Sequence, residues 1–399
     1  MKKKVAIIGA GASGLVAAIA AAQKGAQVTL YEKSNKIGKK IHASGNGRCN
    51  ITNNNISLEN YHGKHPHFAK ETIRFDAKKF FNDLGLELRI GNGTRLYPFS
   101  HQASCVVDFL GFACKQLGVI FEKECEITAI KKEKEHFVLS YHDRHVLSDA
   151  VIIATGSSAM PNLGASDSGY HFAKAFGHQI EEPFAALVQL TSDESLFSKA
   201  SGVKLEADMQ IYVDKQPKMK LRGDLLFTTY GLSGSGILDL SRIASKATMH
   251  QQEVSIMIDL LPDLSQQAMK ALLQKLLPLQ LPLTLGLNGI IPKKLIEPIM
   301  IHAKIDASKP LNHKTINTLA YTLKNLKVSI SGTRGAKGAE IMAGGINTQE
   351  INPKTMESTH IKGLYFAGEV LDIDGDCGGY NLHWAWSSGF KAGESSAKV

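Results

Sequence analysis

The glycines near the amino terminus constrain this chain most strongly. They stand in Gly9-Ala10-Gly11-Ala12-Ser13-Gly14, between an apolar run of strand type over residues 3–8 and an alanine-rich helical pattern over residues 15–24. Alternating residues 27–32 predict a second strand. A strand, a glycine turn, a helix and a strand in this order predict a βαβ unit whose turn binds a dinucleotide.

Each position of this turn has an expected physical task. Gly9 permits a tight turn, Gly11 lets a pyrophosphate approach the backbone, and Gly14 allows the helix to pack closely on the strand. The free N–H groups and the dipole of the helix attract phosphate, so Ala12 and Ser13 belong to the expected site. Glu32, at the end of the second strand, is expected to accept hydrogen bonds from a ribose diol. The alternative is an ordinary glycine-rich turn in a parallel sheet.

The carboxyl-terminal part repeats the pattern of strand, loop and helix over residues 363–392. A single nicotinamide-binding domain does not need this second unit, whereas FAD lies extended and its flavin end can meet a distal helix N-terminus. We therefore expect FAD, with Glu369 at the ribityl hydroxyls and backbone amides near Asn381 and Leu382 at the flavin carbonyl. A helix that merely closes the core is the alternative.

The pattern of predicted strands and helices between these two ends indicates an inserted part. Closely spaced strand patterns begin near residue 186, helical patterns follow, and the α/β pattern returns only near the end. The expected fold class is α/β, with three parts. They are a discontinuous FAD-binding domain (residues 1–185 and 345–399), an antiparallel β-barrel-like domain (186–262 and 327–344) and a small helical lobe (263–326).

Composition excludes several classes of protein. With 43% hydrophobic and 21% charged residues, the chain is not a disordered scaffold. The formal charge of +9 is spread along the chain, which indicates no dedicated nucleic-acid face. Five cysteines without regular spacing favour neither disulfides nor a zinc ribbon, and they suggest a reducing cytoplasm. The apolar residues 272–287 contain two prolines and are shorter than the ~20 residues of a membrane-spanning helix, so no membrane partner is expected.

Several further segments are specific enough to compare with known families. They are Ala43-Ser44-Gly45-Asn46-Gly47-Arg48-Cys49-Asn50-Ile51-Thr52-Asn53, Ala154-Thr155-Gly156, Gly363-Leu364-Tyr365-Phe366-Ala367-Gly368-Glu369-Val370-Leu371-Asp372 and Gly378-Gly379-Tyr380-Asn381-Leu382. These segments resemble the BaiN-like, aminoacetone-oxidase-like family of FAD flavoproteins. The resemblance extends over nearly the whole chain, although Thr229, Ser235 and Met342 depart from the family pattern.

The resemblance implies an FAD domain of the glutathione-reductase type that is interrupted by the barrel-like domain and the helical lobe. It implies that Lys33 lies near the adenosine ribose, that Ile127 contacts adenine through its backbone, and that further residues line the pyrophosphate and flavin. The further expected cofactor-binding residues are Lys39, Lys40, Ser44, Gly45, Asn46, Gly47, Thr155, Gly156 and Gly368.

Three residues are candidates for catalysis. Arg48 has a guanidinium that can hold a substrate carboxylate or phosphate, or can clamp its own loop or the cofactor pyrophosphate. Tyr380 and Asn381 can touch the flavin or substrate, or can cap the helix that follows. A redox pair of Cys49 and Cys377 is conceivable, but two incidental thiols are the simpler interpretation. The pattern favours no metal ligands, since the histidines of residues 62–67 fit a solvated loop.

These observations predict an FAD-dependent oxidoreductase that transfers a hydride through flavin N5, with a small organic molecule as substrate. Residues 332–338 contain three glycines without the strand-to-helix context, so NAD(P)H is expected only as a transient electron donor, and oxygen remains an alternative acceptor. Two other functions stay open: a tRNA-modifying flavoprotein, and a flavin-binding protein without turnover. The sequence does not indicate the oligomeric state.

Overall fold

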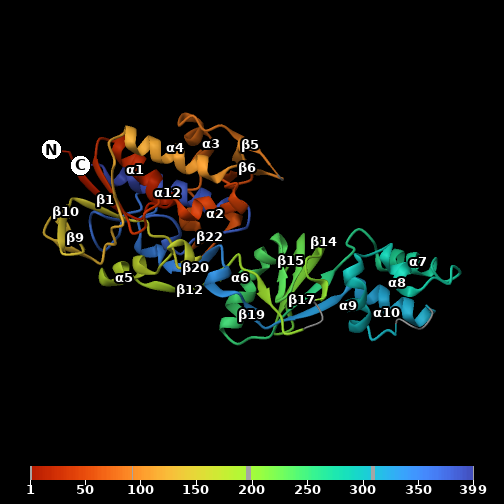
Figure 1. Cartoon of the computed structure of the whole chain (residues 1–399). Coiled ribbons are helices and arrows are strands. Elements are labelled where there is room, and N and C mark those ends of the chain that lie inside the picture. The colour runs from red at the N-terminus through yellow and green to blue at the C-terminus, as the bar shows by residue number, and fades with distance from the viewer. Residues whose placement is uncertain (1, 92, 195–198, 307–310, 399) are drawn as a thin grey trace. The chain divides into compact units, whose positions relative to one another are not determined.

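The computed structural model of the chain describes residues 2–91, 93–194, 199–306 and 311–398. The chain forms two compact units. The first consists of Met1–Phe184 and Glu340–Val399, and the second, Ala185–Ala339, is inserted into it (Figure 1). No described helix is long and apolar enough to cross a membrane.

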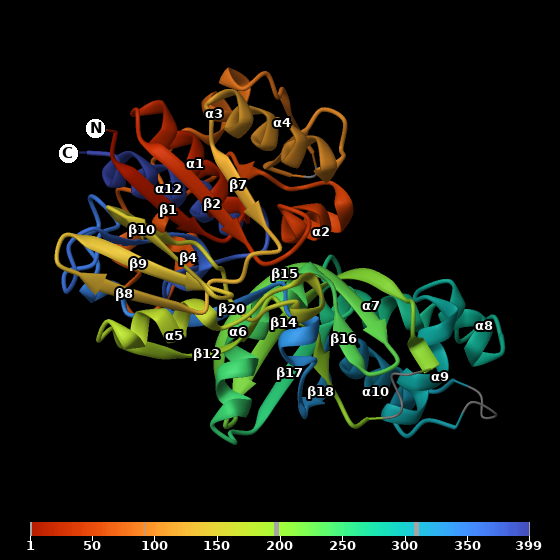
Figure 2. The same cartoon turned by 60° about the vertical axis from the view of Figure 1, so that its left-hand side comes forward.

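A five-stranded parallel sheet lies at the centre of the first unit (Figure 2). In spatial order its strands are β21 (Leu364–Phe366), β11 (Ala150–Ile153), β1 (Lys4–Ile8), β2 (Gln27–Glu32) and β7 (Ile120–Lys123). Strands β1, β11 and β21 are almost entirely buried, because a parallel sheet is covered on both faces. The expected strands of the βαβ unit are thus confirmed.

The strand order creates a crevice at the carboxyl ends of β1 and β11. The chain moves from β1 to β2 and β7 in one direction, and then crosses back to β11 on the other side of β1. Because such crossovers are right-handed, the connections beside β1 leave for opposite faces of the sheet. The returning connection contains a three-stranded antiparallel sheet of β8 (Ala129–Glu133), β9 (His136–Tyr141) and β10 (Arg144–Ser148). Ligands of open α/β sheets bind at such a switch point.

Two helices pack with their backbones in contact on this sheet. They are α1 (Ala12–Gln23) and α12 (Tyr380–Ser396). A Cβ added to Gly389 would lie 2.3 Å from the Ser13 carbonyl oxygen, and one added to Gly393 would lie 2.3 Å from the Ala17 carbonyl oxygen. The two contacts advance together along both helices, so α1 and α12 run in the same direction.

The remaining elements of the first unit are short. The helices are α2 (Lys39–Gly47), α3 (Ala77–Asp83), α4 (Ala103–Gln116), α5 (Ser168–Ala175) and the 3₁₀ turn η6 (Gly368–Val370). The small sheets pair β3 (Thr52–Asn53), β6 (Arg95–Pro98) and β5 (Leu88–Ile90); β22 (Asp374–Gly375) and β4 (Tyr61–His62); and β12 (Ile180–Ala186) and β20 (Ile341–Ile346).

An antiparallel sheet of seven strands lies in the second unit. Its order is β18 (Leu326–Ile330), β17 (Val254–Asp259), β14 (Lys204–Val213), β15 (Gln216–Thr228), β16 (Gly231–Ser233), β13 (Leu190–Thr191) and β19 (Gly332–Thr333). Only Ser331 separates β18 from β19, although they stand at opposite ends of this order. The sheet therefore curls enough to bring one end of β18 next to β19, although no hydrogen-bond ladder joins these two strands in the described residues.

Helices share the core of the second unit. Helix α6 (Ser235–Met249) packs on the sheet, and four shorter helices contribute buried Leu and Ile side chains to the same hydrophobic cluster. These four are α7 (Gln266–Gln274), α8 (Leu283–Asn288), α9 (Lys293–His302) and α10 (His313–Lys324). The short α11 (Gly335–Gly338) precedes the return to the first unit.

The expected fold class is confirmed. Its division of the inserted part into a barrel and a helical lobe stays a prediction, and residues 195–198 and 307–310 of those parts lie outside the described residues.

The residue pattern predicts a loop over residues 34–55 and one helix over residues 70–84, and both predictions are wrong. Residues 34–55 show no helical periodicity, yet they contain α2, which begins after Gly38 in a left-handed conformation and is interrupted within the glycine-rich stretch. Residues 70–84 suggest one helix, but α3 begins only at Ala77, because the Asp76 side chain accepts a hydrogen bond from the Lys79 backbone and caps the helix there.

The helix contact can be tested with Gly393→Ala. The added methyl group gains about 1 kcal/mol of helix propensity, but it meets backbone atoms that cannot move aside. We expect the free energy of unfolding to fall by about 1–3 kcal/mol in thermal or urea denaturation. Gly111→Ala in α4 is the control, since its Cβ would meet only the side-chain tip of Ile37, at 3.3 Å. Equal stability of both variants would contradict the packing.

Candidate functional site

The glycine turn connects the end of β1 to α1 at the switch point. Gly9 has a φ of +102°, and a Cβ there would lie 2.5 Å from the Ala154 carbonyl oxygen. A Cβ on Gly14 would lie 1.9 Å from the Gly9 carbonyl oxygen. Gly11 differs, because a Cβ there would meet no described atom within 4 Å. Sterics therefore require the first and third glycines, while the second borders open space in front of α1.

Among the described residues, no side chain caps the amino end of α1. Gly11 is the N-cap residue, and it has no side chain that could accept a hydrogen bond from the first turn. Ala12 and Ser13 begin the helix, and the Ser13 hydroxyl donates to the Ala367 carbonyl oxygen at 3.3 Å. Uncapped N–H groups that face open space are a ready anion site.

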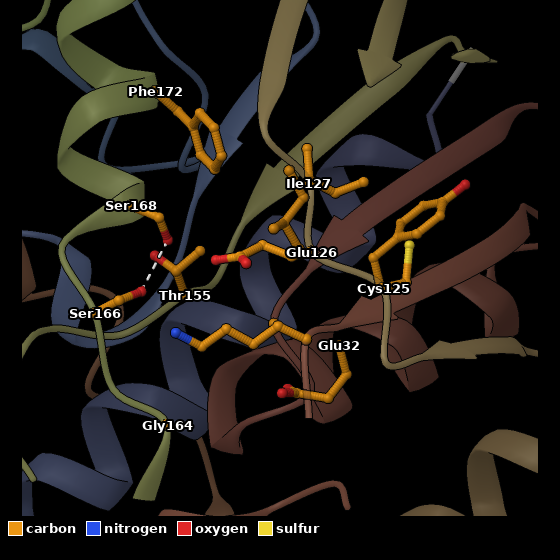
Figure 3. A pocket seen from close by; sticks show the side chains of 13 residues that line it. Glu32, Cys125, Glu126, Ile127, Thr155, Gly164, Ser166, Ser168 and Phe172 are labelled. Atoms are coloured by element: carbon orange, nitrogen blue, oxygen red, sulfur yellow. Dashed lines mark hydrogen bonds between the residues drawn. The ribbon is translucent and has the colours of Figure 1, made fainter. Parts of the chain in front are cut away.

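A pocket beside this turn gathers several of the expected residues (Figure 3). Its space measures about 420 Å³, part of it open to solvent. Gly9, Glu32, Lys33, Ile127 and Thr155 line it together. Sequence reasoning missed its other lining residues, which are Ile8, Tyr31, Cys125, Glu126, Gly164, Ser166, Ser168 and Phe172. Residues 164–172 carry no recognisable motif, so no sequence signal was available for that wall.

Two N–H groups fix the Glu32 carboxylate in this pocket. One oxygen accepts from the Ala10 backbone at 2.9 Å, and the other accepts from the Ser34 backbone at 2.8 Å. Each carboxylate oxygen keeps a further lone pair for a ligand. The Thr155 hydroxyl is buried without a hydrogen-bond partner among the described residues, although buried polar groups are nearly always satisfied. A nucleoside in this pocket offers hydroxyl groups to both.

A second group of expected residues meets at Glu369. The Lys40 ammonium donates to its carboxylate at 2.7 Å, and the Met342 backbone donates at 2.9 Å. The Ser157 hydroxyl is a further donor. A Cβ on Gly156 would lie 3.9 Å from the same carboxylate. Lys39 precedes Lys40 in the first turn of α2. This carboxylate thus joins α2, β20, η6 and the segment after β11.

The glycine-rich end of α2 forms an exposed backbone surface. Ser44 leaves the helical conformation with ψ of 143°, and Gly45 and Asn46 are left-handed with φ of 56° and 55°. A Cβ on Gly47 would meet no described atom within 4 Å. Arg48 ends the helix and is exposed. Peptide groups here are open to a ligand.

The amino end of α12 lies beside the segment that follows α2. A Cβ on Gly379 would lie 2.8 Å from the Asn50 side-chain oxygen, which is buried and has no partner among the described residues. The Asn381 amide is engaged inside its own loop, because it accepts from the Gly375 backbone at 2.8 Å and donates to the Gly375 carbonyl at 2.7 Å. Its side chain therefore shapes the loop before the helix.

Two more candidate residues are held by packing. Tyr380 is 8% exposed, and its ring makes an edge contact with Tyr61 at 6.2 Å between centroids. Leu382 is partly buried against the core of the first unit. Side-chain chemistry from either residue is thus restricted, while the backbone of this helix end stays available.

The thiols of the conceivable redox pair lie in different environments. Cys49 is 0% exposed, and burial raises the pKa of its thiol to about 12. Cys377 is partly exposed, and its carbonyl oxygen accepts from the Arg95 guanidinium at 3.4 Å. Redox cysteines react as thiolates, so Cys49 is poorly suited to cycling near neutral pH.

A histidine cluster that the sequence did not reveal lies near the start of β12. His178, Glu350 and His360 bring their nitrogen and oxygen atoms within 4.8 Å of one another, a spacing that could hold a metal ion. Ser358 fixes the tautomer of His178. Its oxygen already accepts from two backbone N–H groups at 3.0 Å, so its hydroxyl hydrogen points to His178 Nε2 at 2.8 Å. His178 therefore donates from Nδ1 to Glu350, at 3.1 Å.

The geometry of this cluster fits a set of structural hydrogen bonds better than a metal centre. The two imidazole rings are stacked, with centroids 4.5 Å apart and planes 16° apart. A metal ion lies close to the plane of each imidazole that binds it, and stacked rings offer no such shared position. Burial, together with His360, lowers the pKa of His178 against the opposing effect of Glu350.

The low pKa of His178 predicts a pH-dependent stability. In the unfolded chain this imidazole takes up a proton near pH 6.5, whereas the folded chain resists protonation. The free energy of unfolding therefore decreases as pH falls below about 6.5, by up to about 1.4 kcal/mol per pH unit for one proton. Urea denaturation between pH 7.5 and 5.5 should show a shallower slope for His178→Asn. His171→Asn is the control, since the His171 side chain is 69% exposed. A wild-type slope in both variants would contradict the assignment.

A family model and curated relatives match the chain over nearly its whole length. The family model described as HI0933-like protein Rossmann domain matches residues 3–395. A 3-dehydro-bile acid delta(4,6)-reductase of Clostridium scindens is 36% identical over 406 residues, covering 99% of each chain. A ribosomal RNA dihydrouridine synthase of Escherichia coli is 34% identical over 389 residues, covering 96% of this chain and 95% of that protein. A solved 3-ketosteroid-delta4-(5alpha)-dehydrogenase of Rhodococcus jostii RHA1 aligns with a TM-score of 0.49 and 14% identity, covering 100% of this chain and 97% of that one.

The chain belongs to the HI0933-like Rossmann family. The resemblance drawn from its sequence motifs is confirmed by the family match and by the relatives. At the level of class, the expected FAD-dependent oxidoreductase on a Rossmann-type fold is confirmed as well.

The glycine turn can be tested at Gly11. Gly11→Glu places bulk and negative charge in open space before α1, where no described atom would be displaced, so the protein should fold and purify without FAD. The ratio of flavin to protein absorbance measures the loss, and circular dichroism checks the fold. Gly111→Ala in α4 should keep its flavin. Full FAD content in Gly11→Glu would contradict the assignment of the turn.

Proposed function

We propose that this protein is an FAD-dependent reductase of carbon–carbon double bonds that are conjugated to a carbonyl group. The observation that carries the proposal is the similarity, over nearly the whole chain, to two proteins whose names share this chemistry. A delta(4,6) reduction of a 3-dehydro steroid acts on double bonds conjugated to a ketone, and dihydrouridine arises by reduction of the C5=C6 bond beside a uracil carbonyl. In both reactions a hydride adds to one carbon and a proton to the other.

The described residues fit FAD at the adenosine end. The uncapped α1 terminus at Gly11 would hold the pyrophosphate, the Glu32 carboxylate would accept from the ribose hydroxyls, and the Ile127 backbone would face adenine. The unsatisfied Thr155 hydroxyl supports a polar ligand in the same pocket. Bound FAD supplies the hydride transfer.

The flavin end would lie toward α12. Its N-terminal Gly379 is left-handed with φ of 96° and provides no side-chain cap, so the first N–H groups and the helix dipole can stabilise negative charge on a ligand. Glu369, held by Lys40, would accept from ribityl hydroxyls, and the exposed peptides of Ser44–Gly47 would border the same ligand. This chain's contribution to the reaction is then orientation and charge stabilisation.

Electrons must come from outside the chain. Each reduced double bond consumes two electrons and two protons, and NAD(P)H is the proposed donor of the hydride to FAD. Residues 332–338 do not form a second dinucleotide turn, because β19 there is two residues long and α11 four residues. The donor would therefore share the flavin face with the substrate, in alternation.

A specific observation favours RNA as the carrier of the reduced double bond. The inserted unit, residues 185–339, holds nineteen Lys and Arg against twelve Asp and Glu, which is +7 of the chain's formal charge of +9, so the expectation that this charge is spread along the chain is wrong. Such asymmetry attracts a polyanion. The similarity to the Escherichia coli protein supports the same substrate class, whereas the Clostridium scindens protein supports a small enone.

The experiment is an anaerobic spectral titration of the FAD-loaded protein. NADPH, then NADH, should bleach the yellow flavin, and a conjugated enone or a uridine-containing RNA should restore the colour stoichiometrically. Mass spectrometry should find two added hydrogen atoms in the accepted substrate. A flavin that stays oxidised with both nucleotides, or a reduced flavin that neither substrate reoxidises, would overturn the proposal in favour of an oxidase or of flavin binding without turnover.

A further inference from the structure

We propose that the β5–β6 hairpin and the segment after it form a stacking platform for a nucleobase of single-stranded RNA, with Phe99 as its principal ring and Arg89 as its cation. The inference rests on the proposed function and specifies how RNA would be held at that site. It concerns the first unit alone.

The composition of this stretch is compatible with a nucleic-acid contact, although the exposed Ile90 also lies in it. Residues 88–101 contain two arginines, one tyrosine, one phenylalanine and one histidine, and no Asp or Glu. Proteins that bind single strands combine cations for the backbone with exposed aromatic rings on which bases stack. Aliphatic docking surfaces need neither the cations nor the rings.

Phe99 is an exposed ring on a fixed backbone. The residue is 63% exposed, so its ring is accessible to a stacking partner. Its backbone N–H donates to the Glu87 carbonyl at 3.1 Å, which extends the ladder set by the Leu88↔Pro98 pair. The Arg89 guanidinium carbon lies 5.5 Å from the ring centroid. Ring and cation are therefore already placed together before any ligand arrives.

A second ring pair continues this surface. Tyr97 and His101 stack with centroids 5.5 Å apart and planes 28° apart. His101 has a φ of 53°, a left-handed conformation that is uncommon outside glycine, and its N–H donates to the Pro98 carbonyl at 2.9 Å. A tight turn thus brings the imidazole back over the strand that carries Tyr97.

The hairpin borders the proposed flavin end. A Cβ on Gly45 would lie 3.7 Å from a ring carbon of Tyr97, so the strand touches the exposed glycine segment after α2. On the other side the Arg95 guanidinium donates to the Cys377 carbonyl at 3.4 Å, just before α12 begins. A base stacked on this platform would leave its neighbour in the strand close to the flavin.

The test compares two phenylalanines of equal exposure. Phe99 on the hairpin and Phe112 on α4 are both 63% exposed. Fluorescence anisotropy with a labelled uridine-rich single-stranded RNA at low salt measures affinity, and bound flavin absorbance checks that each variant is folded. We expect Phe99→Ala to weaken binding by roughly 5- to 150-fold, as for the loss of one stacked base, and Phe112→Ala to bind as wild type.

Phe99→Trp should retain binding and Phe99→Leu should lose it. Arg89→Gln should reduce the salt dependence of binding by about one phosphate contact.

Several outcomes would overturn the platform. They are wild-type affinity in Phe99→Ala, equal losses in Phe99→Ala and Phe112→Ala, and full affinity in Phe99→Leu, which would show that RNA binding needs no aromatic ring at this position. A wild-type protein that binds no RNA yet reduces an enone would also overturn it, while leaving the proposed reductase intact. A wild-type protein that binds RNA through Phe99 but reduces neither substrate would instead contradict the proposed function.

Discussion

The backbone contact between α1 and α12 fixes the relative positions of the two helix ends at which a ligand can bind. Gly389 meets Ser13 and Gly393 meets Ala17, so the helices run in the same direction with a fixed offset. Helix α12 begins nine residues before its contact with Ser13, whereas α1 begins one residue before it. At 1.5 Å per residue, the two amino ends are staggered by roughly 12 Å. One extended dinucleotide can therefore present its pyrophosphate to one helix end and its flavin to the other.

The small residues around this contact serve the same geometry. Gly9 lies against Ala154 because the adjacent ends of β1 and β11 form the crevice of the sheet, and Gly14 lets α1 approach its own turn. Glu369 then ties α2 and the segment after β11 to η6 through one carboxylate. Each interaction narrows the positions that a ligand backbone can take, which is how the proposed hydride transfer would be oriented.

The sequence predicts the parts of this site that depend on local chemistry. The three glycines lie between a strand and a helix, and Glu32 ends the next strand. All four residues fall within some twenty positions, so local sequence predicts the turn, and the turn forms as expected. The wall of Ser166, Ser168 and Phe172 was not predictable, because those side chains reach the pocket only through tertiary packing. The hydrogen bonds of His178 with Glu350 and Ser358 join residues about 170 to 180 positions apart, and no local sequence pattern predicts them. Asn381 differs, because the sequence motif that contains it is present but its side-chain amide hydrogen-bonds to the Gly375 backbone.

We propose that the staggered amino ends of α1 and α12 bind one FAD, and a crystal structure of the flavin-loaded protein would show where the cofactor lies. We expect the pyrophosphate over Gly11 at the start of α1, and the flavin carbonyl at the amino end of α12 beside Gly379. The adenine ring should fill the pocket lined by Glu32 and Ile127. Adenine or pyrophosphate density at any other place, or a flavin ring directed away from α12, would contradict it.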